Sequence, residues 1–117
     1  MGKDDYYVIV AKILIFLYKK LKGKAETTIG EYIVPMTKDF PIDEDYLQYV
    51  IVKLFERGYV EDVLITRARG GEVIRVDVSR MQITPEGIDY LRENSTVRKI
   101  AEALPAALPI ISLFQSI

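Results

Sequence analysis

The first apolar run of the chain is bounded by charges of opposite sign. Asp4 and Asp5 precede it, a group of lysines closes it, and Gly23 follows. This order of charge suits the dipole of a helix, and glycine often follows a helix end. Because residues 7–17 are apolar on nearly every side, we predict a helix from Asp5 to Leu21 that is central in the fold or buried in a dimer interface.

An irregular stretch follows and leads into an amphipathic helix. Residues 24–42 contain one glycine and two prolines, and we expect one short helix or turn there. Asp43 and Glu44 open the next helix, and Gly58 ends it. Its apolar stripe has the spacing of one helix face: Leu47, Val50, Ile51, Leu54 and Phe55. The opposite face carries Asp45, Gln48, Tyr49, Val52, Lys53 and Glu56.

After Gly58 the apolar pattern changes to that of strands. Residues 59–66 and 73–83 are rich in valine and isoleucine, and a turn sequence with Gly70 and Gly71 separates them. This arrangement predicts a β-hairpin with arginines at its tip. In the second strand Ile74, Val76 and Val78 share one face, whereas two later apolar residues, Met81 and Ile83, have the opposite parity. We therefore predict a bulge near Ser79 and Arg80 that places all five in the core.

Two further helices are predicted from residue 84 onward. Thr84 supplies a capping hydroxyl, Pro85 suits the first helical position, and Glu86 suits the positive end of the dipole. Ile88 and Leu91 then face inward. Asn94 closes this helix, and Ser95 or Thr96 opens another, whose apolar residues repeat at helical spacing: Val97, Ile100, Ala101 and Leu104.

The end of the chain is strongly apolar. From Ala103 onward no charged residue appears, and Pro105 and Pro109 should kink or end the helix. The stretch is shorter than the ~20 residues that span a bilayer, so we expect no membrane span. It either folds back on the body or packs on a second copy. We favour a homodimer, with an interface formed by Ile100, Leu104, Leu108, Ile111, Leu113 and Phe114.

Composition excludes several classes of function. The 117 residues make one domain, and they include no histidine and no cysteine. Thiol nucleophiles, imidazole bases and zinc sites built from these ligands are therefore excluded. There is no phosphate-binding glycine loop, and Asp43-Glu44-Asp45 lacks the spacing of a calcium loop. Neighbouring Glu61 and Asp62 would point to opposite faces of a strand. We expect no enzyme, no cofactor and no metal, and a cytoplasmic protein, because no signal peptide is evident.

Charge is unevenly distributed along the chain. The formal net charge is −1. Residues 41–62 hold Lys53 and Arg57 against six carboxylates, a net charge of −4, whereas residues 63–80 hold four arginines against Glu72 and Asp77, a net charge of +2. The amphipathic helix is thus acidic, and the hairpin that follows is basic.

An amphipathic helix that ends at Phe55-Glu56-Arg57-Gly58-Tyr59-Val60 and leads into a hairpin is the sequence pattern of a winged helix. With that hairpin before it, Ile83-Thr84-Pro85-Glu86-Gly87-Ile88-Asp89-Tyr90-Leu91-Arg92-Glu93-Asn94 resembles the YjcQ-like family of small winged-helix proteins from Gram-positive bacteria and their phages. The resemblance covers roughly residues 6–103. It implies an α+β winged helix and a role in DNA binding or phage-linked regulation. We expect a winged-helix domain over residues 1–95 and a packing or dimerisation element over residues 96–117.

Two functions remain open at this point. In the first, a dimeric winged-helix protein binds double-stranded DNA and acts as a phage- or prophage-linked transcriptional regulator. Arg67, Arg69 and Arg75 would contact phosphates, and Gln48, Tyr49 and Lys53 would lie nearest the bases. The acidic start of the helix opposes this function, because carboxylates repel phosphates. In the second, the domain binds another protein through the acidic helix face or the apolar tail.

Overall fold

The computed structural model describes residues 5–23 and 44–115. They form helices α1 (Asp5–Leu21), α3 (Glu44–Glu56), α4 (Pro85–Glu93), α5 (Ser95–Ala103) and α6 (Ser112–Gln115), with the 3-10 helix η1 (Pro105–Ile110). Four short strands lie between α3 and α4: β1 (Val60–Glu61), β2 (Leu64–Arg67), β3 (Val73–Asp77) and β4 (Gln82–Ile83). The predicted α+β class is confirmed. The short helix expected within residues 24–42 lies outside the described residues.

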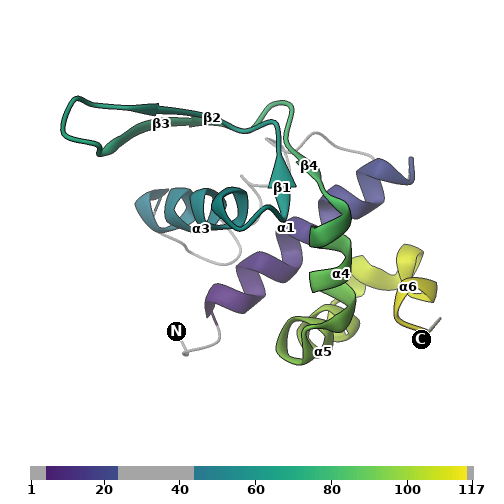
Figure 1. Cartoon of the computed structure of the whole chain (residues 1–117). Coiled ribbons are helices and arrows are strands. Elements are labelled where there is room, and N and C mark those ends of the chain that lie inside the picture. The colour runs from purple at the N-terminus through teal and green to yellow at the C-terminus, as the bar shows by residue number, and fades with distance from the viewer. Residues whose placement is uncertain (1–4, 24–43, 116–117) are drawn as a thin grey trace.

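Helix α1 has the predicted bounds and lies at the centre of the fold (Figure 1). It packs against α3, α4, α5, β4 and η1. Its middle is buried almost completely: Ile9, Val10, Ala11, Ile13, Leu14, Ile15, Phe16 and Leu17 are at most 4% exposed. One chain therefore covers the helix that is apolar on nearly every side.

The predicted hairpin consists of two short antiparallel sheets in succession. At its base β1 pairs with β4, with Val60 opposite Ile83. Farther out β2 pairs with β3, and the register shifts between Thr66 and Arg67. This outer part, β2–β3, projects beyond the body of the molecule (Figure 1) and is called the hairpin from here on.

The irregularity predicted near Ser79 and Arg80 is confirmed, and it is larger than a bulge. A turn at these two residues separates β3 from β4, and the carboxylate of Asp77 accepts the Ser79 backbone N–H at 3.0 Å. After this turn Met81 and Ile83 are buried, at 0% and 4% exposed. The turn thus reorients the chain so that the apolar residues after it point into the core.

For three side chains, the prediction of whether they are buried or exposed is wrong. Phe55 is 38% exposed and Ile74 is 61% exposed, although both were assigned to the core, whereas Val52 is only 8% exposed. Val52 lies on the side of α3 that borders the hairpin, away from the predicted apolar stripe. Ile74 lies on β3, in the part of the hairpin that projects beyond the body of the molecule.

Side-chain caps begin the last two long helices. The hydroxyl of Thr84 accepts the Gly87 N–H at 3.0 Å, as predicted, and also donates to the Gly58 carbonyl at 2.5 Å. Asn94 ends α4, as predicted, and its side-chain oxygen accepts the Val97 N–H at 3.0 Å. Asn94, and not Ser95 or Thr96, is therefore the cap of α5.

The apolar end of the chain folds back on the body. Helix α5 ends before Pro105, and η1 packs against α1 and α5. The buried residues of this segment are Ala107, Ile110, Leu113 and Phe114. The Arg98 guanidinium donates to the Phe114 carbonyl and holds the last turn in place. No helix in the described part of the chain is long and apolar enough to cross a membrane.

Candidate nucleic-acid interface

A groove lies between the exposed face of α3 and the hairpin. Its volume is about 520 Å³. Four of the six residues predicted to contact DNA line it: Gln48, Tyr49, Lys53 and Arg67. We call it the α3–hairpin groove. The structure thus brings together residues that the helix and the hairpin supply separately.

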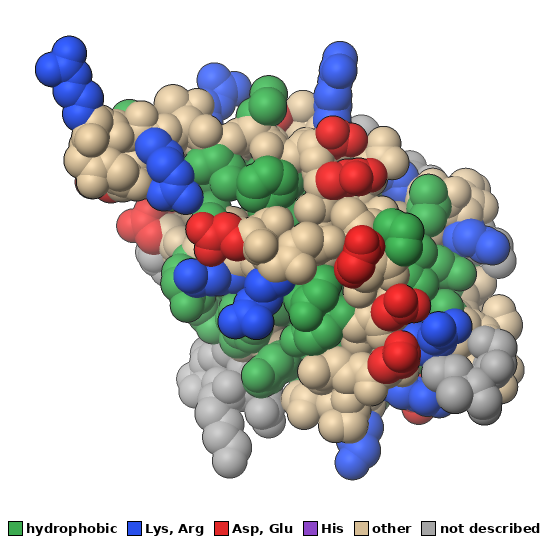
Figure 2. Space-filling view, in the orientation of Figure 1, with side chains coloured by type: hydrophobic (Ala, Val, Ile, Leu, Met, Phe, Trp, Pro, Cys, Tyr) green, Lys and Arg blue, Asp and Glu red, His purple; other side chains and the backbone are tan. Residues whose placement is uncertain are grey.

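Three carboxylates also line the α3–hairpin groove: Asp45, Glu56 and Glu72. The acidic tally of residues 41–62 indicated such a conflict, but it could not place Glu72 opposite the helix. Figure 2 shows the outcome on one face of the molecule, where basic side chains project from the hairpin and acidic side chains lie beside them. The groove is therefore mixed in charge.

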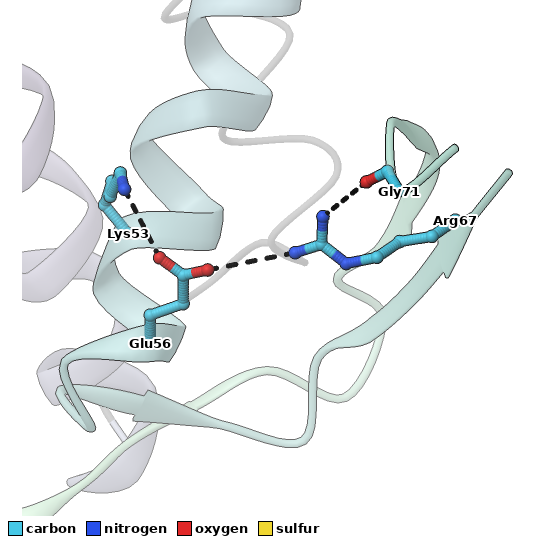
Figure 3. Close-up of polar contacts among 4 residues, drawn as sticks. All are labelled: Lys53, Glu56, Arg67 and Gly71. Carbon is cyan, nitrogen blue, oxygen red and sulfur yellow. Dashed lines mark hydrogen bonds and ion pairs between the residues drawn. The ribbon is translucent and has the colours of Figure 1, made fainter. Parts of the chain in front are cut away.

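Glu56 connects the helix to the hairpin (Figure 3). One of its carboxylate oxygens lies 3.4 Å from Lys53 Nζ, and the other lies 3.8 Å from Arg67 Nη2. Arg67 Nη1 also donates to the Gly71 carbonyl at 2.8 Å, which supports the tip of the hairpin. A single carboxylate thus pairs with two of the cations that were assigned to DNA.

These ion pairs are weak enough to be exchanged for other partners. The side chains of Lys53, Glu56 and Arg67 are 39%, 46% and 45% exposed. Exposed pairs of this kind contribute about 0–1 kcal/mol, because solvent screens them and ordering the side chains costs entropy. A phosphate can therefore compete with Glu56 for both cations.

Tyr49 presents an aromatic ring to this surface. It is 52% exposed, and the ammonium group of Lys53 lies 5.5 Å from the centre of its ring. The ring also stacks with that of Tyr46, at a centroid distance of 6.3 Å. These contacts hold Tyr49 in place and leave part of the ring accessible.

The two remaining predicted arginines lie on the hairpin but do not line the groove. Arg69 is exposed at the tip, and no hydrogen bond or ion pair joins it to another described residue. Arg75 lies opposite Thr66. The pKa of nearby Asp77 is lowered mainly by hydrogen bonds from Ser79, and the charges of Arg75 and Arg80 lower it further. Arg69 and Arg75 are both exposed on the hairpin.

The six residues expected at a dimer interface are divided by their burial. Leu113 and Phe114 are buried within the chain, at 9% and 3% exposed, and Leu108 is 69% exposed. Ile100, Leu104 and Ile111 are half-buried against the core. The homodimer stays a prediction, and Leu108 is the member of the set that is most accessible to a second copy.

The described residues contain no group of three or more acidic, histidine or cysteine side chains placed to hold a metal ion. Comparison with known families gives one match, to the model described as YjcQ protein, over residues 12–107. The chain belongs to the YjcQ protein family. No curated protein and no solved structure matches it. Family membership confirms the resemblance that the residues of α4 suggested.

Proposed function

We propose that this YjcQ-family chain is a winged-helix DNA-binding protein, with α3 as the helix that faces DNA and the hairpin as the wing. The observation that carries the proposal is the α3–hairpin groove. In it Gln48, Tyr49 and Lys53 from the helix lie across from Arg67 of the hairpin. Winged and helix-turn-helix domains present a helix to the major groove in a comparable way.

Each group has a role that its chemistry fits. Arg69 and Arg75 contact phosphates from the outer part of the hairpin, where Arg69 has no partner among the described residues. Gln48 pairs with adenine and Lys53 with guanine, the bases whose edges match their donors and acceptors. Arg67 exchanges Glu56 for a phosphate.

The acidic residues of α3 set a limit on this binding. Glu44 and Asp45 occupy the first turn of the helix, where a recognition helix commonly approaches DNA. Because they repel phosphates, most of the affinity comes from the hairpin, and sequence discrimination is modest. A role in phage-linked regulation and a binding function without catalysis are part of this proposal.

The test is a titration of a fluorescent DNA duplex at low salt, followed by anisotropy. Arg69→Gln and Arg75→Gln should each weaken binding, and the double variant should weaken it further. Lys99→Gln is the matched control, because it removes one positive charge from an exposed position on α5. Equal binding by the double variant and by Lys99→Gln would reject the wing assignment.

A second candidate function is favoured by one observation, the exposed apolar side chains of the hairpin. Leu64 is 68% exposed and Ile74 is 61% exposed. Large exposed apolar side chains such as these occur on surfaces that bind another protein. In this version Leu64→Ser with Ile74→Ser abolishes capture of a protein partner and leaves DNA titrations unchanged, whereas Arg69→Gln has the opposite effect.

We also propose the homodimer as the state in solution. Sedimentation equilibrium should give twice the chain mass of 13.4 kDa at tens of micromolar. Leu108→Asp should shift the protein toward monomer without lowering its thermal stability. A monomer at this concentration would reject the dimer and leave the DNA-binding proposal in place.

A further inference from the structure

A second hollow, of about 410 Å³, lies beside α3. Among the described residues, five tyrosines line it: Tyr6, Tyr7, Tyr49, Tyr59 and Tyr90. They come from the first turn of α1, from α3, from the turn before β1 and from α4. We call this site the tyrosine hollow. Its size lies within the range of roughly 300–1,000 Å³ found for small-molecule sites.

The rings of the tyrosine hollow are held by one another. Tyr59 and Tyr90 stack with their centroids 4.2 Å apart, and Tyr6 meets Tyr7 edge to face at 5.3 Å. Four of the five rings also pack against the core, and Tyr49 is the exposed member. The cluster is therefore a built surface whose rings are fixed by their contacts with one another and with the core.

The phenol hydroxyls are available as donors. No hydrogen bond joins any of the five hydroxyl groups to another described residue. Burial, with a smaller effect from the neighbouring Tyr59, raises the pKa of Tyr90 to about 12. Burial likewise raises the pKa of Tyr6. Both groups stay protonated at neutral pH, so they can donate to an anion.

Two cations complete the wall of the tyrosine hollow, Lys53 and Arg57, and no carboxylate does so among the described residues. Arg57 forms no ion pair with another described residue. Its positive charge acts to lower the pKa of both Tyr6 and Tyr90, against the effect of burial. The site therefore favours an anion and disfavours a cationic ligand. Figure 2 shows basic side chains next to the hydrophobic ones, with tyrosine in the same colour, between α3 and α4.

We propose that the tyrosine hollow binds a free nucleoside monophosphate. The guanidinium of Arg57 and the hydroxyls of Tyr6 and Tyr90 hold the phosphate, because charge-assisted hydrogen bonds from a guanidinium fit its oxygens. The exposed ring of Tyr49 stacks on the base, as aromatic side chains do on nucleobases. An anionic end and a flat aromatic end in one ligand match the two kinds of group in the wall.

The tyrosine hollow shares two residues with the α3–hairpin groove, Tyr49 and Lys53. A bound nucleotide would stack on Tyr49 and lie beside Lys53, so neither residue would be free to meet DNA. Nucleotide binding should therefore weaken DNA binding. This link rests on the proposed function, whereas binding of the nucleotide itself does not.

The experiment is calorimetric titration of the full chain, without DNA, with each of the four nucleoside 5′-monophosphates. The matched probes are the nucleoside, which lacks the phosphate, and ribose 5-phosphate, which lacks the base. At least one monophosphate should bind about tenfold or more tightly than either probe. Arg57→Gln should weaken it by about tenfold or more, the usual loss of a hydrogen bond to a charged group.

Two further variants separate a ligand role from a structural one. Tyr90→Phe keeps the stacked ring and removes only the hydroxyl, so it should weaken the monophosphate and leave the nucleoside unchanged. Lys99→Gln, outside the hollow, should bind as the wild type does. The proposal is overturned if no monophosphate binds better than its nucleoside, or if Arg57→Gln and Lys99→Gln behave alike. Binding of a short single-stranded oligonucleotide but of no monophosphate would also overturn it.

Adding the bound monophosphate to a DNA titration then tests the link. Weaker DNA binding in the wild type, with no effect in Arg57→Gln, supports competition through Tyr49 and Lys53. If DNA binds equally well with and without the monophosphate, the link is wrong although both sites exist. If DNA never binds, the proposed function fails while the calorimetric result stands.

Discussion

At the scale of single residues, the contact between α4 and the turn before β1 depends on Gly87. A Cβ atom at this position would lie 2.1 Å from the Tyr59 carbonyl oxygen and 2.8 Å from Ile83 Cγ1. The helix is able to approach the turn this closely only because residue 87 has no side chain. The Thr84 hydroxyl accepts the Gly87 N–H and donates to the Gly58 carbonyl, so it also holds the start of α4 against this turn.

Gly87→Ala should lower the free energy of unfolding by about 1–3 kcal/mol, the cost of forcing extra volume into a packed site. Alanine's better helix propensity, worth up to about 1 kcal/mol, offsets only part of it. Gly70→Ala is the control, because nothing lies within 4 Å of a Cβ atom there. It should stay within about 0.5 kcal/mol of the wild type in urea unfolding. Equal stability of the two variants would contradict the close approach.

Tyr90 should make stability depend on alkaline pH. Burial raises its pKa from 10.0 to about 12. In that window the unfolded chain loses the proton while the folded chain keeps it, so stability is fully present below pH 10 and falls as the pH rises toward 12. Tyrosinate absorbance should show a late-titrating group that Tyr90→Phe removes. A titration in Tyr90→Phe identical to that of the wild type would contradict this assignment.

At the scale of elements, signals that are local in the sequence predicted the helix boundaries well. The charges at the ends of residues 5–21 and the Thr84-Pro85 pair act within one or two helical turns. A short stretch of sequence is therefore enough to predict where these helices begin and end. The exposure of Ile74 was not predictable in this way. It depends on how far the hairpin projects past the helices, which no local pattern reports.

The cations of the candidate site were predicted, and so were Asp45 and Glu56 on the same face of α3, but the ion pairs between α3 and the hairpin were not. The basic residues of the hairpin and the polar face of α3 were visible in the sequence. That Glu56 meets Arg67, and that Glu72 lines the groove, follows from the distance between two elements. The net charges of residues 41–62 and 63–80 gave the sign of the charge on each element, but they could not give the ion pairs between the elements.

Glu56→Gln tests this pairing of α3 with the hairpin. The change removes one negative charge and frees Lys53 and Arg67 for phosphate, so affinity for DNA at low salt should rise about two- to fivefold, as Coulomb energies near a surface allow. Glu93→Gln makes the same change at an exposed position on α4 outside the groove and should have a smaller effect. If both variants bind DNA equally, Glu56 does not compete for these cations.

At the scale of the whole molecule, the two most apolar segments of the chain, α1 and the C-terminal end, cover each other. Helix α1 and the apolar end meet inside one copy, since η1 packs on α1. One copy of the chain therefore buries most of both segments, and their apolar character does not by itself require a second copy. The apolar end contributes buried residues to the core of its own chain.

Phe114→Ala should lower the free energy of unfolding by about 3–5 kcal/mol, the usual cost of emptying a buried aromatic site, because Phe114 is 3% exposed. Leu108→Ala, at a site 69% exposed in the same segment, should change it by no more than about 0.5 kcal/mol. Thermal or urea unfolding measures both. A larger loss for Leu108→Ala would indicate that a second copy covers Leu108.

The salt dependence of DNA binding tests the central claim most directly. If Arg67, Arg69 and Arg75 each neutralise one phosphate, the logarithm of the binding constant should fall with the logarithm of salt concentration at a slope of about −3 between about 50 and 200 mM. Arg69→Gln and Arg75→Gln should each reduce that slope by about one, and Arg67→Gln by less, because Arg67 gives up Glu56 to bind. No detectable binding at about 50 mM salt, or a slope that these variants leave unchanged, would contradict the assignment of the hairpin as a DNA-binding wing.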